Sequence, residues 1–299
     1  TWVDNAHEFR LTTWHNDPLS DSSGETFYIR DEDSGVFWSP TPLPTGGQSG
    51  YVCRHGFGYS VFEHYQAGIS SELYTYVAMD APVKFMVIKL HNHSRRTRRL
   101  SLTGYWELVL GEWRHANLMH IVTEADPHSG ALFARNAYGR EYAKRIVFAK
   151  VSERERSVTG SRTEFVGRNG SLSSPAAMHR KRLSGKTGAG FDPCAAIQTQ
   201  IELAAGQERE IVFIFGAAHS TDEAQHFIQQ YGGLSGARQA LEAVWKYWNH
   251  ALGAVHVETP DPALDVLING WLIYQTLSCR LWGRSGYYQS GGAYGFRDQ

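Results

Sequence analysis

The sequence predicts a mainly β protein that is followed by α-helices. From residue 1 to about residue 218, apolar and polar residues alternate with a period of two between turns rich in Gly, Pro, Asn and Asp, which is typical of antiparallel strands. After residue 218 the apolar residues recur at helical spacing instead. Many strands with short turns, and no helix-length segments between them, favour a sandwich or a barrel over a βαβ fold.

Length and charge narrow the class of protein further. The 299 residues are about twice the usual length of a domain. Hydrophobic residues make up 42% of the chain and charged residues 20%, which is typical of a globular protein with a sizeable core. The net charge of −1 gives no electrostatic reason to bind nucleic acid or an anionic membrane. No apolar run approaches the roughly 20 residues that a membrane helix needs.

The cysteines and the chain ends bear on compartment and completeness. Cys53, Cys194 and Cys279 are odd in number, far apart and without metal-ligand spacing, which predicts buried thiols in a reducing compartment. The chain opens at Thr1 without an initiator Met and stops at Gln299 directly after a Gly-rich stretch. We therefore expect a piece of a longer protein.

The clearest strands lie in the middle of the β region. Val83, Phe85 and Val87 alternate with polar or flexible residues, the turn-like 91–94 follows, and a long alternating run covers 98–110. We expect these two runs to pair as an antiparallel hairpin. Further strands are predicted over residues 144–151, 196–203 and 210–215.

Three helices are predicted in the last third of the chain. Ser220 and Glu223 have the spacing of a capping box and open the first. Asp261 as N-cap and Pro262 at the first helical position open the third. The helix between them has one apolar stripe, made of Ala237, Leu241, Val244, Trp245, Trp248 and Leu252. The predicted domains are 1–218 (β-sandwich), 219–255 (helical linker) and 256–299 (start of a further helical domain).

Three polar motifs have simple structural explanations. Residues 31–35 (Asp-Glu-Asp-Ser-Gly) offer oxygen ligands for calcium but lack a Glu at the twelfth position, which favours a plain turn. His91 and His93 share one side of an extended segment, yet no third ligand is in range, so we predict no metal site. The basic run 95–99 is typical of a solvated strand end in a neutral protein.

The last 18 residues have a different composition. Two arginines, an aspartate, two glutamines and three tyrosines are placed in a Gly-rich stretch after a helix. Such a loop can close around a polyhydroxylated ligand, and Arg beside a carboxylate offers paired donors and acceptors to neighbouring hydroxyls. The alternative is a structural Arg–Asp pair in a loop between helices, and the residues alone leave both open. The candidate substrate-binding residues are Arg284, Gln289, Arg297 and Asp298.

Residues 289–299, with 274–280 before them, resemble the start of the catalytic domain of glycoside hydrolase family 94, a family of inverting phosphorylases of β-glucosides. The resemblance covers essentially the whole chain and is nearest to members that act on β-1,2-glucans, namely 1,2-β-oligoglucan phosphorylases and the C-terminal part of cyclic β-1,2-glucan synthases. The other matching segments are 16–18, 24–25, 28–31, 38–42, 55–60, 167–170 and 188–194.

The resemblance implies a mutarotase-like super-β-sandwich, a helical linker and the truncated start of an (α/α)6 barrel. It also implies that Arg284, Arg297 and Asp298 hold the non-reducing sugar before the scissile bond. Gln289 stands where cellobiose-type members carry an acid, which puts their disaccharide specificity in doubt. The family's general-acid Asp and phosphate-binding residues would follow Gln299, so no catalytic residue is expected in this chain and the chain alone is expected to be inactive.

The implied function is inverting phosphorolysis, or synthesis, of a β-glucan, with glucose 1-phosphate as product. The implied partners are a β-glucan oligosaccharide and inorganic phosphate as co-substrate, without a cofactor, and the resemblance allows a homodimer. The expected location is the cytoplasm, or the cytoplasmic side of an inner-membrane protein if the parent is a cyclic glucan synthase. The alternative is a non-catalytic carbohydrate-binding or structural β-sandwich domain of such a synthase.

Overall fold

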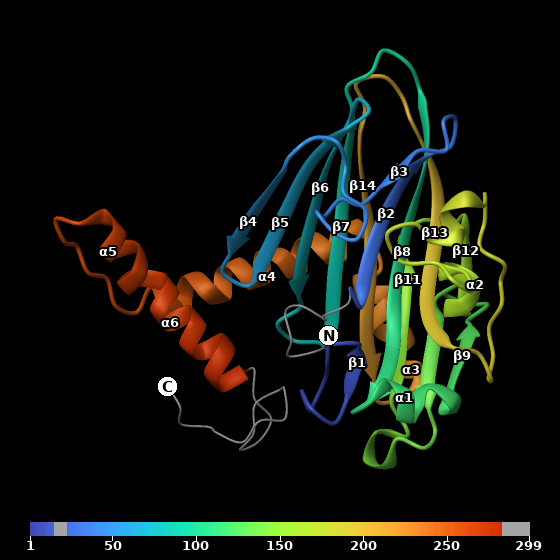
Figure 1. Ribbon diagram of the computed structural model, residues 1–299. Coiled ribbons are helices and arrows are strands. Elements are labelled where there is room, and N and C mark those ends of the chain that lie inside the picture. The colour runs from blue at the N-terminus through green and yellow to red at the C-terminus, as the bar shows by residue number, and fades with distance from the viewer. Residues whose placement is uncertain (15–22, 283–299) are drawn as a thin grey trace.

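A computed structural model describes residues 1–14 and 23–282. Two antiparallel sheets pack face to face, and helices follow them in the chain (Figure 1). One sheet has six strands, in the order β12-β13-β8-β2-β3 with β1 beside β8, and the other has eight, in the order β4-β5-β6-β7-β14-β11-β10-β9. The predicted class, mainly β followed by α, is confirmed.

The strands have the following bounds. The six-stranded sheet contains β1 (Arg10–Thr12), β2 (Glu25–Asp31), β3 (Phe37–Trp38), β8 (Arg98–Gly111), β12 (Arg156–Ser161) and β13 (Pro193–Leu203). The eight-stranded sheet contains β4 (Tyr51–Gly56), β5 (Tyr59–Gln66), β6 (Ile69–Val77), β7 (Val83–Asn92), β9 (Ile121–Ala125), β10 (Leu132–Asn136), β11 (Ile146–Val151) and β14 (Glu208–Ala218).

The main core lies between the two sheets. Because side chains alternate across a strand, one face of each sheet supplies this layer. Trp106 of β8 stacks on Phe215 of β14, with ring centroids 5.3 Å apart, and meets the edge of Phe27 of β2 at 5.5 Å. All three rings are buried. These aromatic residues therefore belong to the core between the sheets.

The predicted hairpin of β7 and β8 is wrong. β7 pairs with β6 and β14, whereas β8 pairs with β2 and β13 in the other sheet, so the connection crosses from one sheet to the other. The buried Asn92 explains how. Its Nδ2 donates to the carbonyl oxygens of Arg96, Leu203 and Ala204 at 2.8–3.0 Å, which ties this crossing to the neighbouring crossing from β13 to β14.

Two one-turn helices precede residue 200, where the sequence predicted none. They are α1 (Arg114–Asn117) and α2 (Arg162–Val166), and 3₁₀ turns lie at Leu118–His120, Arg140–Tyr142 and Ala176–His179. α2 lies on the outer face of the six-stranded sheet, where Phe165 stacks on Tyr105 at 4.6 Å. One helical turn is too short to show a helical period in the sequence.

α3 (Thr221–Tyr231) and α4 (Leu234–Leu252) cover the outer face of the eight-stranded sheet. The predicted cap is confirmed, since Ser220 Oγ accepts from the backbone N–H of Glu223 at 3.2 Å. The apolar stripe of α4 is confirmed in part. Val244 and Trp248 are buried, but 42% of Trp245 is exposed, so its assignment to the core was wrong.

A last helical segment covers residues 262–282. It consists of α5 (Pro262–Val266), α6 (Leu272–Gln275) and π-helical turns at Leu267–Trp271 and Thr276–Trp282. Asp261 is its N-cap, as predicted, and accepts from Ala263 N–H at 2.9 Å. Within the described residues, no helix is both long and apolar enough to span a membrane.

The prediction of three buried thiols is wrong for two of them. Cys194 is fully buried on the outer face of the six-stranded sheet, and burial raises the pKa of its thiol. Cys53 on β4 and Cys279 in the last helical segment are exposed.

Candidate functional site

The predicted substrate-binding residues Arg284, Gln289, Arg297 and Asp298 lie outside the residues that the structure describes. Their assignment stays a prediction. The described helix that leads toward them ends at Trp282, and that tryptophan lines a cavity.

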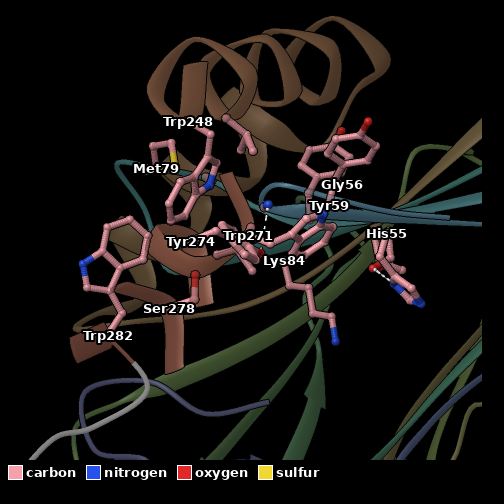
Figure 2. A pocket seen from close by; sticks show the side chains of 17 residues that line it. His55, Gly56, Tyr59, Met79, Lys84, Trp248, Trp271, Tyr274, Ser278 and Trp282 are labelled. Atoms are coloured by element: carbon pink, nitrogen blue, oxygen red, sulfur yellow. Dashed lines mark hydrogen bonds between the residues drawn. The ribbon is translucent and has the colours of Figure 1, made fainter. Parts of the chain in front are cut away.

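The cavity lies where the sandwich, α4 and the last helical segment meet, and its volume is about 710 Å³ (Figure 2). The turn between β4 and β5 forms one side, and the ends of β6 and β7 form another. Aromatic side chains dominate the wall, namely Tyr59, Tyr76, Trp248, Trp271, Tyr274 and Trp282.

Two glycines let the last helical segment approach the sandwich closely. Gly58, at φ +80°, donates its backbone N–H to Tyr274 Oη at 3.0 Å, and a Cβ at this position would lie 2.5 Å from Trp248 Nε1. A Cβ on Gly270 would lie 2.5 Å from Phe57 Cζ. A larger residue at position 58 would therefore push against Trp248 and Val244 of α4, and one at position 270 would force the last helical segment and the β4–β5 turn apart.

Aromatic contacts hold the helix in this position. The ring of Phe57 lies 5.0 Å from Trp271 and 5.2 Å from Tyr274. Trp248 of α4 lies 4.5 Å from Tyr274 and 5.1 Å from Trp282. Such ring pairs prefer defined angles, so they fix direction as well as distance. The end of the helix is thus held directly before residues 283–299.

Polar groups are fewer and are mostly engaged. His55 Nδ1 is 2.8 Å from Ser60 Oγ, and Lys84 Nζ forms an ion pair with Glu25 at 2.7 Å. Burial by itself raises the pKa of Glu25, but Lys84 and the Thr1 amino group outweigh it and hold that pKa well below its usual range. Lys84 is thus a fixed cation at the cavity's edge.

The cavity wall contains no Asp or Glu among the described residues. Aromatic faces, hydroxyls and one ammonium group suit the binding of a neutral, hydroxyl-rich ligand or the packing of further residues. They do not include a carboxylic acid. If proton transfer to a leaving oxygen uses a carboxyl group, that group has to come from residues outside this wall.

The acidic turn and the basic run turn out to be one structure. Asp31 accepts from the backbone N–H groups of Asp33 and Ser34, which confirms the predicted turn, and also binds the guanidinium of Arg98. Arg98 is only 4% exposed, so the prediction of a solvated strand end is wrong there. Arg99 is exposed and pairs with Asp33.

His91 and His93 do lie side by side, with ring centroids 4.0 Å apart. His93 Nε2 lies 2.8 Å from Ser70 Oγ, and His91 Nδ1 lies 3.7 Å from Glu208. In residues 1–14 and 23–282, no group of three His, Cys, Asp or Glu is arranged to hold a metal ion.

Sequence reasoning missed the residues that form the junction. Phe57, Gly58 and Tyr274 belong to the segments 55–60 and 274–280, which were singled out by resemblance, and Trp248 was predicted only as part of the apolar stripe of its helix. Their combination could have been suspected from two aromatic stripes on consecutive helices, but the turn that they contact lies 190 or more residues earlier in the chain and has no local signal.

The chain is a two-sheet sandwich followed by two helices and a further helical segment. Two family profiles match the chain: "Glycosyl hydrolase 94, supersandwich domain" over residues 1–234, and "Glycosyl hydrolase 94 superfamily, catalytic domain" over residues 247–299. The chain belongs to glycoside hydrolase family 94.

Relatives agree with this family. Cyclic beta-(1,2)-glucan synthase NdvB of Rhizobium meliloti (strain 1021) is 36% identical over 302 residues, covering 100% of this chain and 11% of that protein. N,N'-diacetylchitobiose phosphorylase of Vibrio proteolyticus is 24% identical over 97% of this chain and 37% of that protein. Cellobionic acid phosphorylase of Neurospora crassa is 30% identical over 83% and 32%. The chain therefore spans between 11% and 37% of the length of these relatives.

The fold also resembles a solved structure. A bacterial glucoamylase complexed with acarbose superposes with a TM-score of 0.54 over 89% of this chain and 35% of that chain, at 8% identity. At this identity the likeness shows the fold alone. It agrees with a super-β-sandwich that precedes the start of an (α/α)6 barrel.

Proposed function

We propose that the protein carrying this chain cleaves or makes β-1,2-linked glucan by inverting phosphorolysis, with glucose 1-phosphate as the released or consumed sugar phosphate. The observation that carries the proposal is the 36% identity to a cyclic beta-(1,2)-glucan synthase across the whole chain. Family phosphorylases that align over 97% and 83% of the chain support a phosphorylase-type reaction.

The reaction needs only one carboxylic acid. An inverting hydrolase uses one acid for the leaving oxygen and a second carboxylate to activate water. Inorganic phosphate is already anionic, so a phosphorylase needs the acid alone. In this proposal the acid and the phosphate-binding residues follow Gln299, and the chain by itself is inactive.

The contribution of this chain is to hold sugar. Arg284, Arg297 and Asp298 are proposed to bind the non-reducing glucosyl unit before the scissile bond, with Gln289 beside them. Contacts to the sugar ring in the ground state lower the dissociation constant. If these contacts tighten as the ring flattens in the transition state, they also lower the barrier. The aromatic junction at Trp248, Tyr274 and Trp282 supports this role because it fixes the helix that directly precedes these residues in the sequence.

The direct test is phosphate-dependent release of glucose 1-phosphate from β-1,2-linked oligomers by the complete protein. We expect release with inorganic phosphate, none without it, and much slower release from β-1,4-linked oligomers. Equal or faster phosphorolysis of the β-1,4 series would contradict the linkage. Absence of any sugar phosphate would contradict the reaction type.

The sugar-binding residues have their own test. Arg297→Ala and Asp298→Ala should each lower turnover by about two orders of magnitude or more, because a charged partner is left unpaired in the site. Arg135→Ala, at an exposed pair with Glu124, is the control and should leave turnover unchanged. A buried structural pair would instead show a lowered melting temperature, with activity falling only in proportion to folded protein.

A second candidate is a non-catalytic carbohydrate-binding or structural domain within a cyclic glucan synthase. It is favoured by the identity of the 36% relative and by the large share of the chain in the sandwich. The complete protein would then bind β-1,2-glucan without phosphorolysis. In that case we expect the protein on the cytoplasmic side of the inner membrane, whereas a free phosphorylase is expected in the cytoplasm. The free phosphorylase would be a monomer or a homodimer, and sedimentation would distinguish these two states.

A further inference from the structure

A second groove lies on the outer face of the eight-stranded sheet, along the first two thirds of α4. Its volume is about 230 Å³. One wall is apolar and aromatic, with Trp245, Leu241 and Tyr74. The other wall is charged, with Lys89, Glu210 and Arg238.

The strand register explains these two walls. On β6, β7 and β14, Tyr74 lies opposite Val87, which lies opposite Val212. Two residues further along the same strands, Glu72 lies opposite Lys89, which lies opposite Glu210. Because side chains two residues apart share a face, an apolar row and a charged row run side by side across the sheet. α4 covers the apolar row and leaves the charged row partly exposed, with Arg238 of α4 reaching Glu210.

Trp245 is the unexplained member of this groove. Helical spacing places it with the core residues Val244 and Trp248, yet 42% of it is exposed. Its one ring contact in the described part is the edge of Tyr59, at 6.0 Å. An exposed tryptophan beside tyrosines, with a polar rim, is typical of a binding surface.

The charges of the groove compensate one another. Lys89 Nζ lies 3.3 Å from Glu208 and 4.0 Å from Glu72, and Arg238 lies 3.1 Å from Glu210. This wall therefore carries donors and acceptors without a strong net field, which disfavours a phosphate or another anion and suits a neutral ligand with many hydroxyls. The opposite wall offers flat rings for the C–H face of a sugar.

The groove adjoins the junction cavity, since Tyr76 lines both, but it runs along a different part of α4. The last helical segment contacts α4 at its C-terminal end, through Tyr247 and Trp248 against Trp282 and Tyr274. The groove lies further back on α4, from Leu234 to Trp245. Its volume is below that of drug-sized sites and suits a single sugar ring, and the exposed Trp245 and Arg238 leave it open for a longer chain.

We propose that this groove is a second, non-catalytic binding site for a neutral β-glucan chain, with one glucosyl ring on Trp245 and its hydroxyls on the Glu72–Lys89–Glu210 row. The identity of the sugar rests on the proposed function, whereas the existence of the site rests on the groove itself. A site of this kind holds a long substrate near the enzyme and leaves short substrates unaffected.

The test uses the complete protein and linear β-1,2-glucan in affinity gel electrophoresis. Trp245→Ala should weaken polymer binding about tenfold, as expected for the loss of one stacked ring. Trp245→Phe should retain most of the affinity. Trp113→Ala removes a tryptophan of similar exposure (48%) from the connection between β8 and β9 and should bind as the parent does. The KM for long glucan should rise in Trp245→Ala, while the KM for a β-1,2-linked disaccharide stays constant.

Several results would overturn the proposal. The first is that glucan retards Trp245→Ala in the gel as much as the parent, and the second is that Trp113→Ala loses as much affinity as Trp245→Ala. The third is that the KM values for long glucan and for the disaccharide rise equally in Trp245→Ala. The fourth is that Trp245→Ala changes from a dimer to a monomer, which would make the groove a contact between copies of the chain. If Trp245→Ala lowers the melting temperature, Glu210→Gln replaces it and should weaken binding by a smaller factor. If polymer binding depends on Trp245 but the protein shows no phosphorolysis, the binding site is supported and the proposed reaction is rejected.

Discussion

The sandwich and the last helical segment bury their apolar residues to very different extents. In the sandwich, Trp106, Phe213 and Phe215 are completely buried between the sheets. In the helical segment 262–282, the described apolar residues Leu264, Val266, Leu267, Leu272 and Leu281 are 42–59% exposed. One region has a complete core of its own, and the other is held along one side only.

The two regions are therefore stabilised by different contacts. The sandwich gains from apolar area that its own strands remove from water. The helical segment depends on a small aromatic contact with Phe57 and Trp248, and its other apolar side has no partner within the described residues. The catalytic-domain profile begins at residue 247, and the relatives are about three or more times longer than this chain. We therefore expect mutations in the two regions to differ in size and in what they disrupt.

The largest effect is expected in the sandwich core. Trp106→Ala should lower the free energy of unfolding by about 3–5 kcal/mol, because it leaves a cavity among Phe27, Phe213 and Phe215. Leu272→Ala is the matched change in the helical segment and should cost less than about 1 kcal/mol in this chain, since 46% of the residue is exposed. Urea unfolding followed by tryptophan fluorescence compares them, and equal costs would reject the distinction between the regions.

Next in size is the buried ion pair of Asp31 and Arg98. Burial alone would raise the pKa of Asp31, but the N–H groups of Ser34 and Asp33 together with Arg98 lower it. Arg98→Ala should cost about 3 kcal/mol, at the low end for a broken buried pair, because the backbone N–H groups still stabilise the carboxylate.

The neighbouring Arg99 provides the control for that pair. It is exposed and bonds to Asp33, so Arg99→Ala should change the free energy of unfolding much less than Arg98→Ala does. Melting temperatures of both variants in low and high salt give the comparison. Only the Arg99 pair should lose its small contribution on adding salt, because buried pairs are screened less. A salt-sensitive Arg98 would contradict its burial.

Local signals in the sequence predicted local structure well. Ser220 and Asp261 were recognised as N-caps because capping depends on residues within one turn. The prediction that β7 and β8 pair as a hairpin was wrong because the alternation of residues shows which face of a strand is apolar but does not determine which strand it pairs with. Both strands turn their apolar faces to one core from opposite sheets, and the deciding residue, Asn92, acts on carbonyl groups 111 and 112 positions away.

The candidate site was likewise predicted where the signal is local in the sequence and missed where distant segments meet. The Gly-rich composition of residues 283–299 and the family resemblance pointed to the loop with Arg284, Arg297 and Asp298, but its geometry is not decided by the described residues. The junction cavity was not predicted, because Gly58 and Tyr274 are 216 residues apart and meet only through the fold. Trp245 was misassigned because helical spacing gives a side of α4 without saying where the covered row of the sheet ends.

A smaller and more local effect is expected at the junction. Gly58→Ala should strain the +80° backbone and push Trp248 away, at a cost of about 1–3 kcal/mol. Gly35→Ala is the matched control, since Gly35 also has a positive φ (+73°) but its Cβ would meet nothing within 4 Å. The difference between the two variants reports the lost packing. Limited proteolysis should cleave Gly58→Ala faster between residues 253 and 261, and equal cleavage in both variants would show that the junction does not hold the helix.

The smallest effect concerns the pH dependence of the sandwich. His64 is 4% exposed, stacks on Tyr51 at 3.8 Å, and has a lowered pKa because burial disfavours its charged form, although its bond to the carbonyl of Gly50 acts in the opposite direction. The unfolded chain therefore takes up this proton at a higher pH than the folded chain does. The contribution of His64 to stability is full above its ordinary pKa of 6.5 and is lost as the pH falls through the lower pKa of the folded state.

Unfolding in urea at a series of pH values from about 7.5 down to about 5 measures this effect, in the range where histidine titrates. The parent should lose stability toward the acid end, and His64→Phe, which keeps a ring on Tyr51, should lose less. His55→Phe is the matched control, since it makes the same change at an exposed histidine of β4. An equal change of slope in both variants would contradict the assignment to His64. In the last helical segment no histidine occurs, so protection of residues 262–282 against proteolysis should not follow the His64 transition. Joint loss of both would mean that the two regions unfold as one unit.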